Sequence, residues 1–287
     1  MSGRAVVTPI HRVVQGARET DLDLVAAEAP LTIYVQSPLS AATRSLGVVM
    51  RTPGDDRDLV VGLLYTEGVI RARDDVADVS VRATDEQGDV ADVRLADHID
   101  VEKAISGRAL IGTSACGLCG RLSIERVDAL ARRGTPAASA VWAADLIVEL
   151  PAKLRASQTV FDETGGLHAA GLFRGDGTLI ALREDVGRHN AVDKLVGAAL
   201  DAALLPASDA LLVVSGRVAY EIVQKAAVAG VAGLVAVGAP SSLAVEAAQA
   251  TGLLLVGFAR DGRFNVYTGQ DRLSVNFQPR SDSISPR

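Results

Sequence analysis

Hydrophobic residues in the second half of the chain fall into short uninterrupted runs, separated by segments with helical spacing. The runs at 179–182, 210–214, 234–237 and 253–258 predict buried strands. Between the first two runs, apolar residues recur at helical spacing over 192–200. Strands that alternate with helices predict right-handed crossovers and a largely parallel sheet covered by helices. We therefore expect an α/β fold for this half.

The first half contains more strands and a single predicted helix. The predicted strands are Leu31–Tyr34 and Leu46–Arg51, followed by a hairpin of Val76–Val81 with Val90–Leu95. The helix begins at Thr52, which is suited to cap it, has Pro53 in its first position, and ends at Gly68. The whole chain is therefore expected to be α+β.

Breaks in this pattern divide the chain into four parts. They are a strand-rich N-terminal domain with one helix (1–110), a loop and helix (111–135), an α/β domain (141–269) and a polar tail (270–287). Residues 136–140 are interpreted as a linker between the last two folded parts.

The composition excludes several classes of partner. The chain has 287 residues, 3% aromatics and a net charge of -6, which argues against a nucleic-acid-binding surface. The N-terminal residues contain no apolar signal segment, and the most apolar stretch, 226–239, is too short to span a bilayer. We expect a cytoplasmic protein that binds neither nucleic acid nor membrane.

The chain has only two cysteines, and they are three positions apart in Cys116-Gly117-Leu118-Cys119. In a reducing compartment such a pair is more often metal-binding or catalytic than structural. A structural zinc site needs four ligands, and none of the four histidines is spaced from another as a zinc-ligand pair. A zinc site with four thiolates shared between subunits remains open. A deaminase zinc motif is absent, because Ala115 precedes Cys116 and no His-x-Glu occurs.

Two further chemistries fit the cysteine pair. One is a dithiol redox switch, although the flanking residues of a thioredoxin-like motif are missing. The other is a persulfide carrier, which needs an exposed cysteine of low pKa on a glycine-containing loop. A helix beginning near Cys119, together with Arg121, would favour the thiolate. The spacing alone indicates reactive or metal-binding cysteines, with two inert buried cysteines as the remaining alternative.

Three polar segments of the second half are candidate sites for a phosphate-bearing ligand. Ser215-Gly216-Arg217 and the segment 238–242 each follow a strand and open a helix, where backbone N–H groups bind phosphate. Ordinary capping by Ser215 and Ser241 is the alternative. Segment 183–190 is dense in polar groups and contains His189, which is equally compatible with a structural histidine.

The segment 258–263 follows the last predicted strand. Its two arginines, Arg260 and Arg263, are suited to hold a diphosphate, and Phe258 is suited to lie against a base. The alternative is a solvated turn, because Asp261-Gly262 is a common hairpin signal.

Several long motifs, in order along the chain, resemble the formate dehydrogenase accessory sulfurtransferase family, FdhD. The resemblance spans about Arg44 to Thr268. The matching stretches are RTPGDDRDLVVGLLYTEGVI at Arg51–Ile70, TSACGLCGRLSIE at Thr113–Glu125, GGLHAAGLF at Gly165–Phe173, REDVGRHNAVDKLVG at Arg183–Gly197, VSGRVAYEIVQKAAVAGV at Val214–Val231 and GFARDGRFNVYTG at Gly257–Gly269.

The resemblance implies a sulfur carrier with defined partners. Sulfur passes from a cysteine desulfurase to the molybdenum cofactor in its bis(molybdopterin guanine dinucleotide) form, which is bound as a substrate before it enters formate dehydrogenase. It also implies a C-terminal domain similar in fold to cytidine deaminases but without their zinc, no permanently bound metal, and a homodimer. Such a two-fold dimer would suit a ligand with two guanine dinucleotides.

The resemblance also assigns roles to residues. Cys116 matches the cysteine that carries the persulfide, and Cys119 either tunes its thiolate or releases the sulfur by closing a disulfide. The matching cofactor-binding stretch is Phe258, Ala259, Arg260, Asp261, Gly262 and Arg263, to which we add Ser215, Gly216, Arg217 and His189. Two other hypotheses remain: a chaperone that only shelters the cofactor, and a structural protein stapled by zinc.

Overall fold

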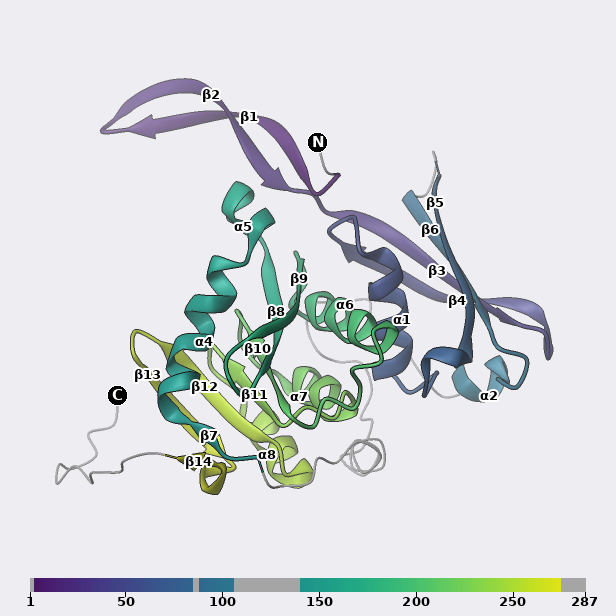
Figure 1. The fold of residues 1–287 in the computed structure, drawn as a ribbon. Coiled ribbons are helices and arrows are strands. Elements are labelled where there is room, and N and C mark those ends of the chain that lie inside the picture. Colours follow the sequence, from purple (N-terminus) through teal and green to yellow (C-terminus); the bar gives the residue numbers. More distant parts are fainter. Residues whose placement is uncertain (1–2, 85–87, 106–139, 275–287) are drawn as a thin grey trace.

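The apolar runs of the second half form the strands of a six-stranded sheet in the computed structural model, which describes residues 3–84, 88–105 and 140–274 (Figure 1). Its strands are β8 (His168–Arg174), β9 (Leu179–Asp185), β10 (Ala210–Val214), β11 (Gly233–Ala236), β12 (Leu254–Arg260) and β13 (Arg263–Thr268). The helices of this part are α4 (Ala144–Ala156), α5 (Thr159–Thr164), α6 (Arg188–Asp201), α7 (Tyr220–Val228) and α8 (Ser242–Thr251).

The sheet has the strand order β13-β12-β11-β10-β8-β9 and is covered on both faces. Apolar side chains of β8, β10, β11 and β12 alternate between the two faces, since successive residues of a strand point to opposite sides. One set packs with α6, α7 and α8, and the other packs with α4. The α/β character expected for this half is confirmed.

The largely parallel pairing that the sequence predicts is wrong. Within this six-stranded sheet of the described residues, only β10, β11 and β12 pair in parallel, whereas β12–β13, β10–β8 and β8–β9 are antiparallel. The reason lies in two short connections, β8 to β9 and β12 to β13, which allow a hairpin but not the longer crossover that parallel strands require. β8, which the apolar pattern does not reveal, then separates β9 from β10.

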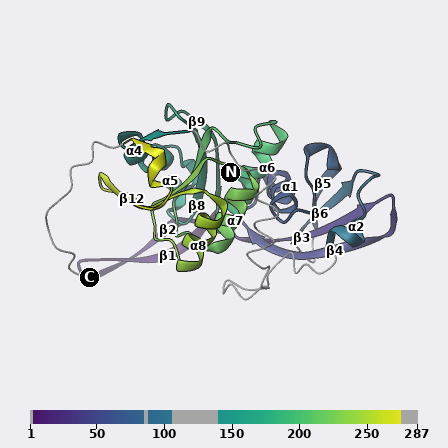
Figure 2. The same cartoon turned by 90° about the horizontal axis from the view of Figure 1, so that it is seen from below.

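The first half forms a second sheet with the order β4-β3-β6-β5. Its elements are β3 (Ala29–Ser37), β4 (Ser40–Arg51), α1 (Asp56–Thr66), η1 (Arg73–Asp75), β5 (Val76–Thr84), β6 (Gly88–Leu95) and α2 (Val101–Ile105). The predicted hairpin of β5 with β6 is confirmed. Buried leucines and valines of α1 pack on this sheet, so that α1 lies between it and α6 (Figure 2).

Two glycines bring α1 and α6 into backbone contact. A Cβ atom on Gly62 would lie 1.8 Å from the carbonyl oxygen of Asp193, and one on Gly197 would lie 2.0 Å from that of Asp58. Neither distance allows a side chain. The α1–α6 crossing is therefore closer than any residue but glycine permits, and it joins the two halves of the molecule.

The helix α1 begins at Asp56, with Asp55 as its N-cap, rather than at Thr52 as predicted. Thr52 is instead used in tertiary contacts. Its backbone N–H donates to Asp185, its hydroxyl accepts from the backbone of Val186, and its carbonyl accepts from Lys194. Thr52 has the side chain of a helix cap, but its hydroxyl and its backbone groups are used in these long-range hydrogen bonds instead.

The remaining described elements lie at the ends of these segments. They are the ribbon of β1 (Ala5–Val14) with β2 (Ala17–Ala26), the pair β7 (Trp142–Ala143) with β14 (Leu273–Ser274), and η2 (Gln270–Arg272). The ribbon projects past α5 (Figure 1). The elements η2 and β14 extend the folded part beyond the predicted limit at 269. No helix among the described residues is long and apolar enough to span a membrane.

Candidate functional site

Two glycine-containing loops, which follow β10 and β11, meet beside Phe258 of β12 at the carboxyl edge of the parallel strands. The Gly238 N–H donates to the Gly216 carbonyl at 3.1 Å, and the Phe258 N–H donates to the Gly238 carbonyl at 3.0 Å. A Cβ atom on Gly238 would lie 2.8 Å from the Gly216 oxygen. Such close packing of loops requires glycine at this position, and it fixes the edge of the sheet where ligands of α/β proteins commonly bind.

The Ser215-Gly216-Arg217 segment does not open a helix, contrary to the sequence-based expectation. The helix α7 begins only at Tyr220, because Val218 first forms a parallel bridge with Pro240. The Ser215 hydroxyl accepts a hydrogen bond from the Ala169 backbone N–H at 2.9 Å, so it does not cap α7. Ser241, in contrast, caps α8 by accepting from Ala244, as the capping alternative predicts.

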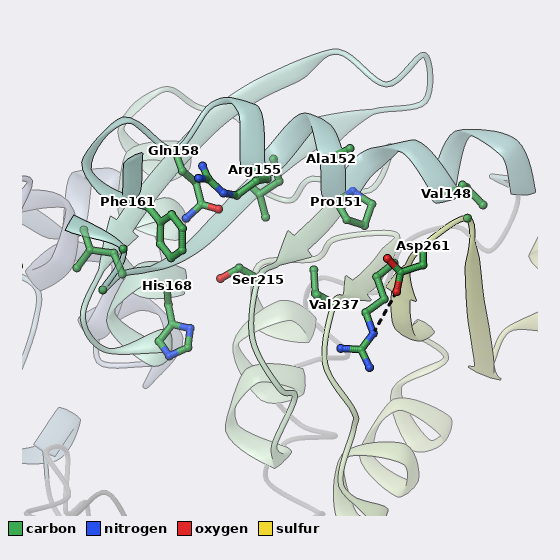
Figure 3. Close-up of a pocket in the computed structure, with 16 residues that line it drawn as sticks. Val148, Pro151, Ala152, Arg155, Gln158, Phe161, His168, Ser215, Val237 and Asp261 are labelled. Carbon is green, nitrogen blue, oxygen red and sulfur yellow. Dashed lines mark ion pairs between the residues drawn. The ribbon is translucent and has the colours of Figure 1, made fainter. Parts of the chain in front are cut away.

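A pocket of about 680 Å³ opens beside these loops (Figure 3). Helices α4 and α5 form one wall, residues 165–168 and Ser215 form another, and Val237 and the segment 260–262 complete it. A volume of this size is typical of pockets that bind small molecules. The pocket therefore unites segments from four separate regions of the C-terminal half.

One end of the pocket is formed by the turn between β12 and β13. Asp261 (φ 54°) and Gly262 (φ 73°) both have positive φ, the geometry of a tight hairpin turn. Arg260 pairs loosely with Asp261, the Nε–Oδ2 distance being 4.0 Å, and Arg260 pairs with Arg263 across the ladder. The hairpin alternative is thus confirmed, and the same turn presents Arg260 at the pocket.

The other end of the pocket is formed by Gln158 and Phe161, with the Arg155 guanidinium 4.4 Å above the Phe161 ring centre. Figure 3 shows these three side chains grouped together, away from Asp261. Gln158 is only 2% exposed, and its amide nitrogen has no hydrogen-bond partner among the described residues. A buried amide nitrogen without a partner is unusual and calls for an explanation.

His168, at the start of β8, lies beside Phe161 at this same end of the pocket (Figure 3). Burial lowers the pKa of its imidazole below 6.5, and the charges of Arg188 and Arg217 lower it further, against the effect of Asp185. The ring is therefore neutral at pH 7 and can both donate and accept a hydrogen bond. The Ser215 hydroxyl, which already accepts one bond, keeps its proton for donation.

The predicted site residues are only partly brought together. Ser215, Arg260, Asp261 and Gly262 line the pocket, whereas Phe258, Ala259, Arg263, Gly216, Arg217 and His189 do not. Ala259 is fully buried. Cys116 and Cys119 lie outside the described residues.

His189 lies on α6, in a separate group of charges. Burial lowers the pKa of His189 to about 4, and the neighbouring positive charges of Arg188 and Lys225 add to this effect. Its Nε2 atom is buried, 4.0 Å from the carboxylate of Glu221. Among residues 3–84, 88–105 and 140–274, no group of three His, Cys, Asp or Glu side chains is placed to hold a metal.

Among the pocket residues that are not predicted as site residues, those with a polar or aromatic side chain are Arg155, Gln158, Phe161 and His168. The first three lie in a stretch whose apolar pattern gives no sign of a site. His168 lies within the GGLHAAGLF motif, and a lone histidine among small residues is the one signal that points to this wall.

A model of the FdhD/NarQ family matches residues 26–274. The chain belongs to this family. Two similar proteins are both named sulfur carrier protein FdhD. The one from Nocardia farcinica is 48% identical over 281 residues, covering 95% of this chain and 96% of the relative. The one from Sulfolobus acidocaldarius is 41% identical over 266 residues, covering 93% and 97%.

A crystal structure of a formate dehydrogenase accessory protein from Desulfotalea psychrophila is also similar. Its TM-score is 0.69 at 23% sequence identity, and the match covers 94% of this chain and 99% of that chain. At this identity the similarity establishes the fold alone. The FdhD/NarQ match includes both cysteines and the whole pocket, from Val148 to Gly262.

Proposed function

We propose that this FdhD/NarQ protein is a sulfur carrier that delivers sulfur to the molybdenum cofactor before the cofactor enters formate dehydrogenase. The observation that carries this proposal is the family membership, together with nearly full-length relatives that are named sulfur carriers. The accessory protein of similar fold supports the link to formate dehydrogenase.

Cys116 is the proposed carrier of the sulfur. Its thiolate attacks the terminal sulfur of a persulfide on a cysteine desulfurase, and the desulfurase cysteine leaves as a thiolate. The product is a persulfide on Cys116. Thiolates are the reacting species in such exchange, so the reaction depends on a lowered pKa of the attacking thiol. Cys119 either assists this ionisation or later displaces the sulfur by closing a disulfide with Cys116.

The pocket is the proposed binding site for the cofactor, which the protein binds as a substrate in its bis-guanine-dinucleotide form. Arg260 provides a cation for a phosphate, and the Ser215 hydroxyl and neutral His168 provide further polar contacts. The Gln158 amide nitrogen, which has no hydrogen-bond partner in the described part of the chain, makes this end of the pocket suited to a polar heterocycle. A pocket of about 680 Å³ accommodates one nucleotide arm, so two protomers of a homodimer would hold both arms.

Formate dehydrogenase activity tests the proposal. Cells lacking this protein are supplied with the wild type, Cys116→Ser or Cys119→Ser, and protein levels are matched by immunoblotting. We expect activity to be lost with Cys116→Ser. Full activity with both variants would contradict sulfur transfer and favour a chaperone that only shelters the cofactor, which needs the pocket but not the thiols.

A further inference from the structure

The end of the pocket opposite Arg260 contains a polar group whose partner is not among the described residues. Gln158 lies between α4 and α5, and its backbone is fully used. Its N–H donates to the Arg155 carbonyl at 3.2 Å, and its carbonyl accepts from the Asp162 N–H at 3.2 Å. Its side-chain amide nitrogen is buried and has no such bond in this part of the chain. Burying such a donor is unfavourable unless something pairs with it.

Two flat groups lie beside this amide. The Phe161 ring lines the pocket, and the Arg155 guanidinium covers it at 4.4 Å while also pairing with Asp162. Aromatic rings and guanidinium planes are the surfaces on which nucleobases stack. Figure 3 shows Ser215 and Val237 between this end and Asp261. The pocket thus has a flat, amide-bearing end and a cationic end.

The flat end is held in place before any ligand binds. The buried carboxylate of Glu184 accepts hydrogen bonds from the backbone N–H groups of Val160 at 3.0 Å and Phe161 at 2.9 Å. These bonds consume the N–H groups at the start of α5, so no anion is expected there. Glu184 therefore positions Phe161 and its neighbour Gln158 without contacting a ligand.

We propose that Gln158 recognises the base of the bound nucleotide, with its amide hydrogen-bonded to the edge of a guanine ring at the Phe161 end and the phosphates directed toward Arg260. This assignment rests on the function proposed above. Guanine presents a ring N–H donor beside a carbonyl acceptor, and a side-chain amide offers the complementary acceptor and donor. The separation of the two ends along the pocket fits a base and a diphosphate of one ligand.

Calorimetric titration of the purified full-length protein with GDP and with GMP tests the assignment. The variants are Gln158→Leu, which removes both polar amide atoms at similar volume, Arg260→Ala, and the control Gln249→Leu on the exposed surface of α8. We expect Gln158→Leu to bind both nucleotides about five- to a hundredfold more weakly, as for two lost hydrogen bonds. Arg260→Ala should weaken the binding of GDP more than that of GMP, and the control should bind both nucleotides like the wild type.

The outcomes separate the two proposals. If Gln158→Leu binds GDP like the wild type while Arg260→Ala does not, the pocket assignment stands and the role of Gln158 is overturned. If the wild type fails to bind GDP, or if neither variant changes binding, both are overturned. If Gln158→Leu fails to fold, Phe161→Leu tests the same end of the pocket. This variant should weaken the binding of GDP and of GMP by the same factor.

Discussion

Buried polar groups are satisfied in one region of this protein and left unsatisfied in another, both near the carboxyl edge of the main sheet. At the junction of α1, α6 and α7, the buried charges of Lys225, Asp193, Lys194 and Asp185 are paired. Lys225 donates to Thr66 at 3.0 Å and to Asp193 at 2.9 Å, and Lys194 lies 2.8 Å from Asp185. At the pocket, the Gln158 amide nitrogen has no partner in the described part of the chain.

The difference teaches how to separate structural from functional polar groups. Paired charges on α6, α7 and β9 also hold Thr66 and Thr52 of the first half through hydrogen bonds, and nothing further is needed to explain them. An unpaired amide lining a cavity is explained by a ligand. Much of the segment 183–190, a candidate site from sequence alone, consists of structural polar groups. Asn190 donates to Asp185 and to the Met50 carbonyl, and Asp185 accepts from the Thr52 N–H.

The largest effect is expected at the paired junction. Lys225→Met leaves the Asp193 carboxylate, which is 2% exposed, without its cation. Removing one partner of a buried ion pair costs about 3–5 kcal/mol. Urea denaturation monitored by circular dichroism measures this loss. The double variant Lys225→Met/Asp193→Leu should recover most of it, and a single-variant loss below about 1 kcal/mol would show that the pair does not stabilise this junction.

A smaller loss is expected from Gly62→Ala. The added methyl group collides with the α6 backbone at Asp193, so the helices must separate, at a cost of about 1–3 kcal/mol or more. Gly3→Ala is the matched control, because a Cβ atom there meets nothing within 4 Å. Equal melting temperatures for the two variants would contradict the close crossing.

The pH dependence of stability is the third prediction. The pKa of His189 is about 4 in the folded state, below its ordinary 6.5, so between these values the unfolded state binds more protons. Stability therefore falls as the pH falls from 7 to 4. Allowing for solvent screening of the partly exposed ring, His189→Gln should remove about 1 kcal/mol of this loss. The free energy of unfolding is measured at several pH values for both proteins. The same dependence on pH for the variant and the wild type would contradict this role of His189.

The smallest effect is expected at the pocket itself. Because the Gln158 amide nitrogen has no partner among the described residues, Gln158→Leu removes an unpaired buried donor and should leave the free energy of unfolding unchanged or slightly raised without ligand. Thermal unfolding measures this, with Gln249→Leu alongside. A loss of stability comparable to that of Lys225→Met would show that Gln158 is a structural residue and that the two regions do not differ.

The sequence predicts those elements whose local pattern and buried environment agree. The strand β10 is predicted at 210–214, where the structure has it, because an uninterrupted apolar run suits a strand buried on both faces. The N-cap of α8 at Ser241 is equally readable. The strand β8 is not, since its alanines and glycine carry little periodicity, and without it the predicted pairing of the sheet is incorrect.

The pocket is less predictable than the fold. Arg260 and Ser215 belong to segments that the sequence singles out. Gln158 and Phe161 reach the site only through the packing of α4 on the sheet and the hydrogen bonds from the start of α5 to Glu184. Phe258 is expected against a base, yet Phe161 is the aromatic residue that lines the cavity. The residues at the two ends of the pocket are far apart along the chain and come together only in the folded protein. No local sequence pattern can therefore predict that they share one site.

Sulfur transfer to Cys116 is the central claim, and intact-mass spectrometry tests it most directly. The wild type, Cys116→Ala and Cys119→Ala are each incubated with a cysteine desulfurase and cysteine under anaerobic conditions, and peptide mapping locates any added sulfur. We predict that the wild type and Cys119→Ala gain one sulfur atom on Cys116, and that Cys116→Ala gains none. A Cys116→Ala protein that still gains one sulfur, with Cys119 unmodified, would contradict the assignment of the carrier.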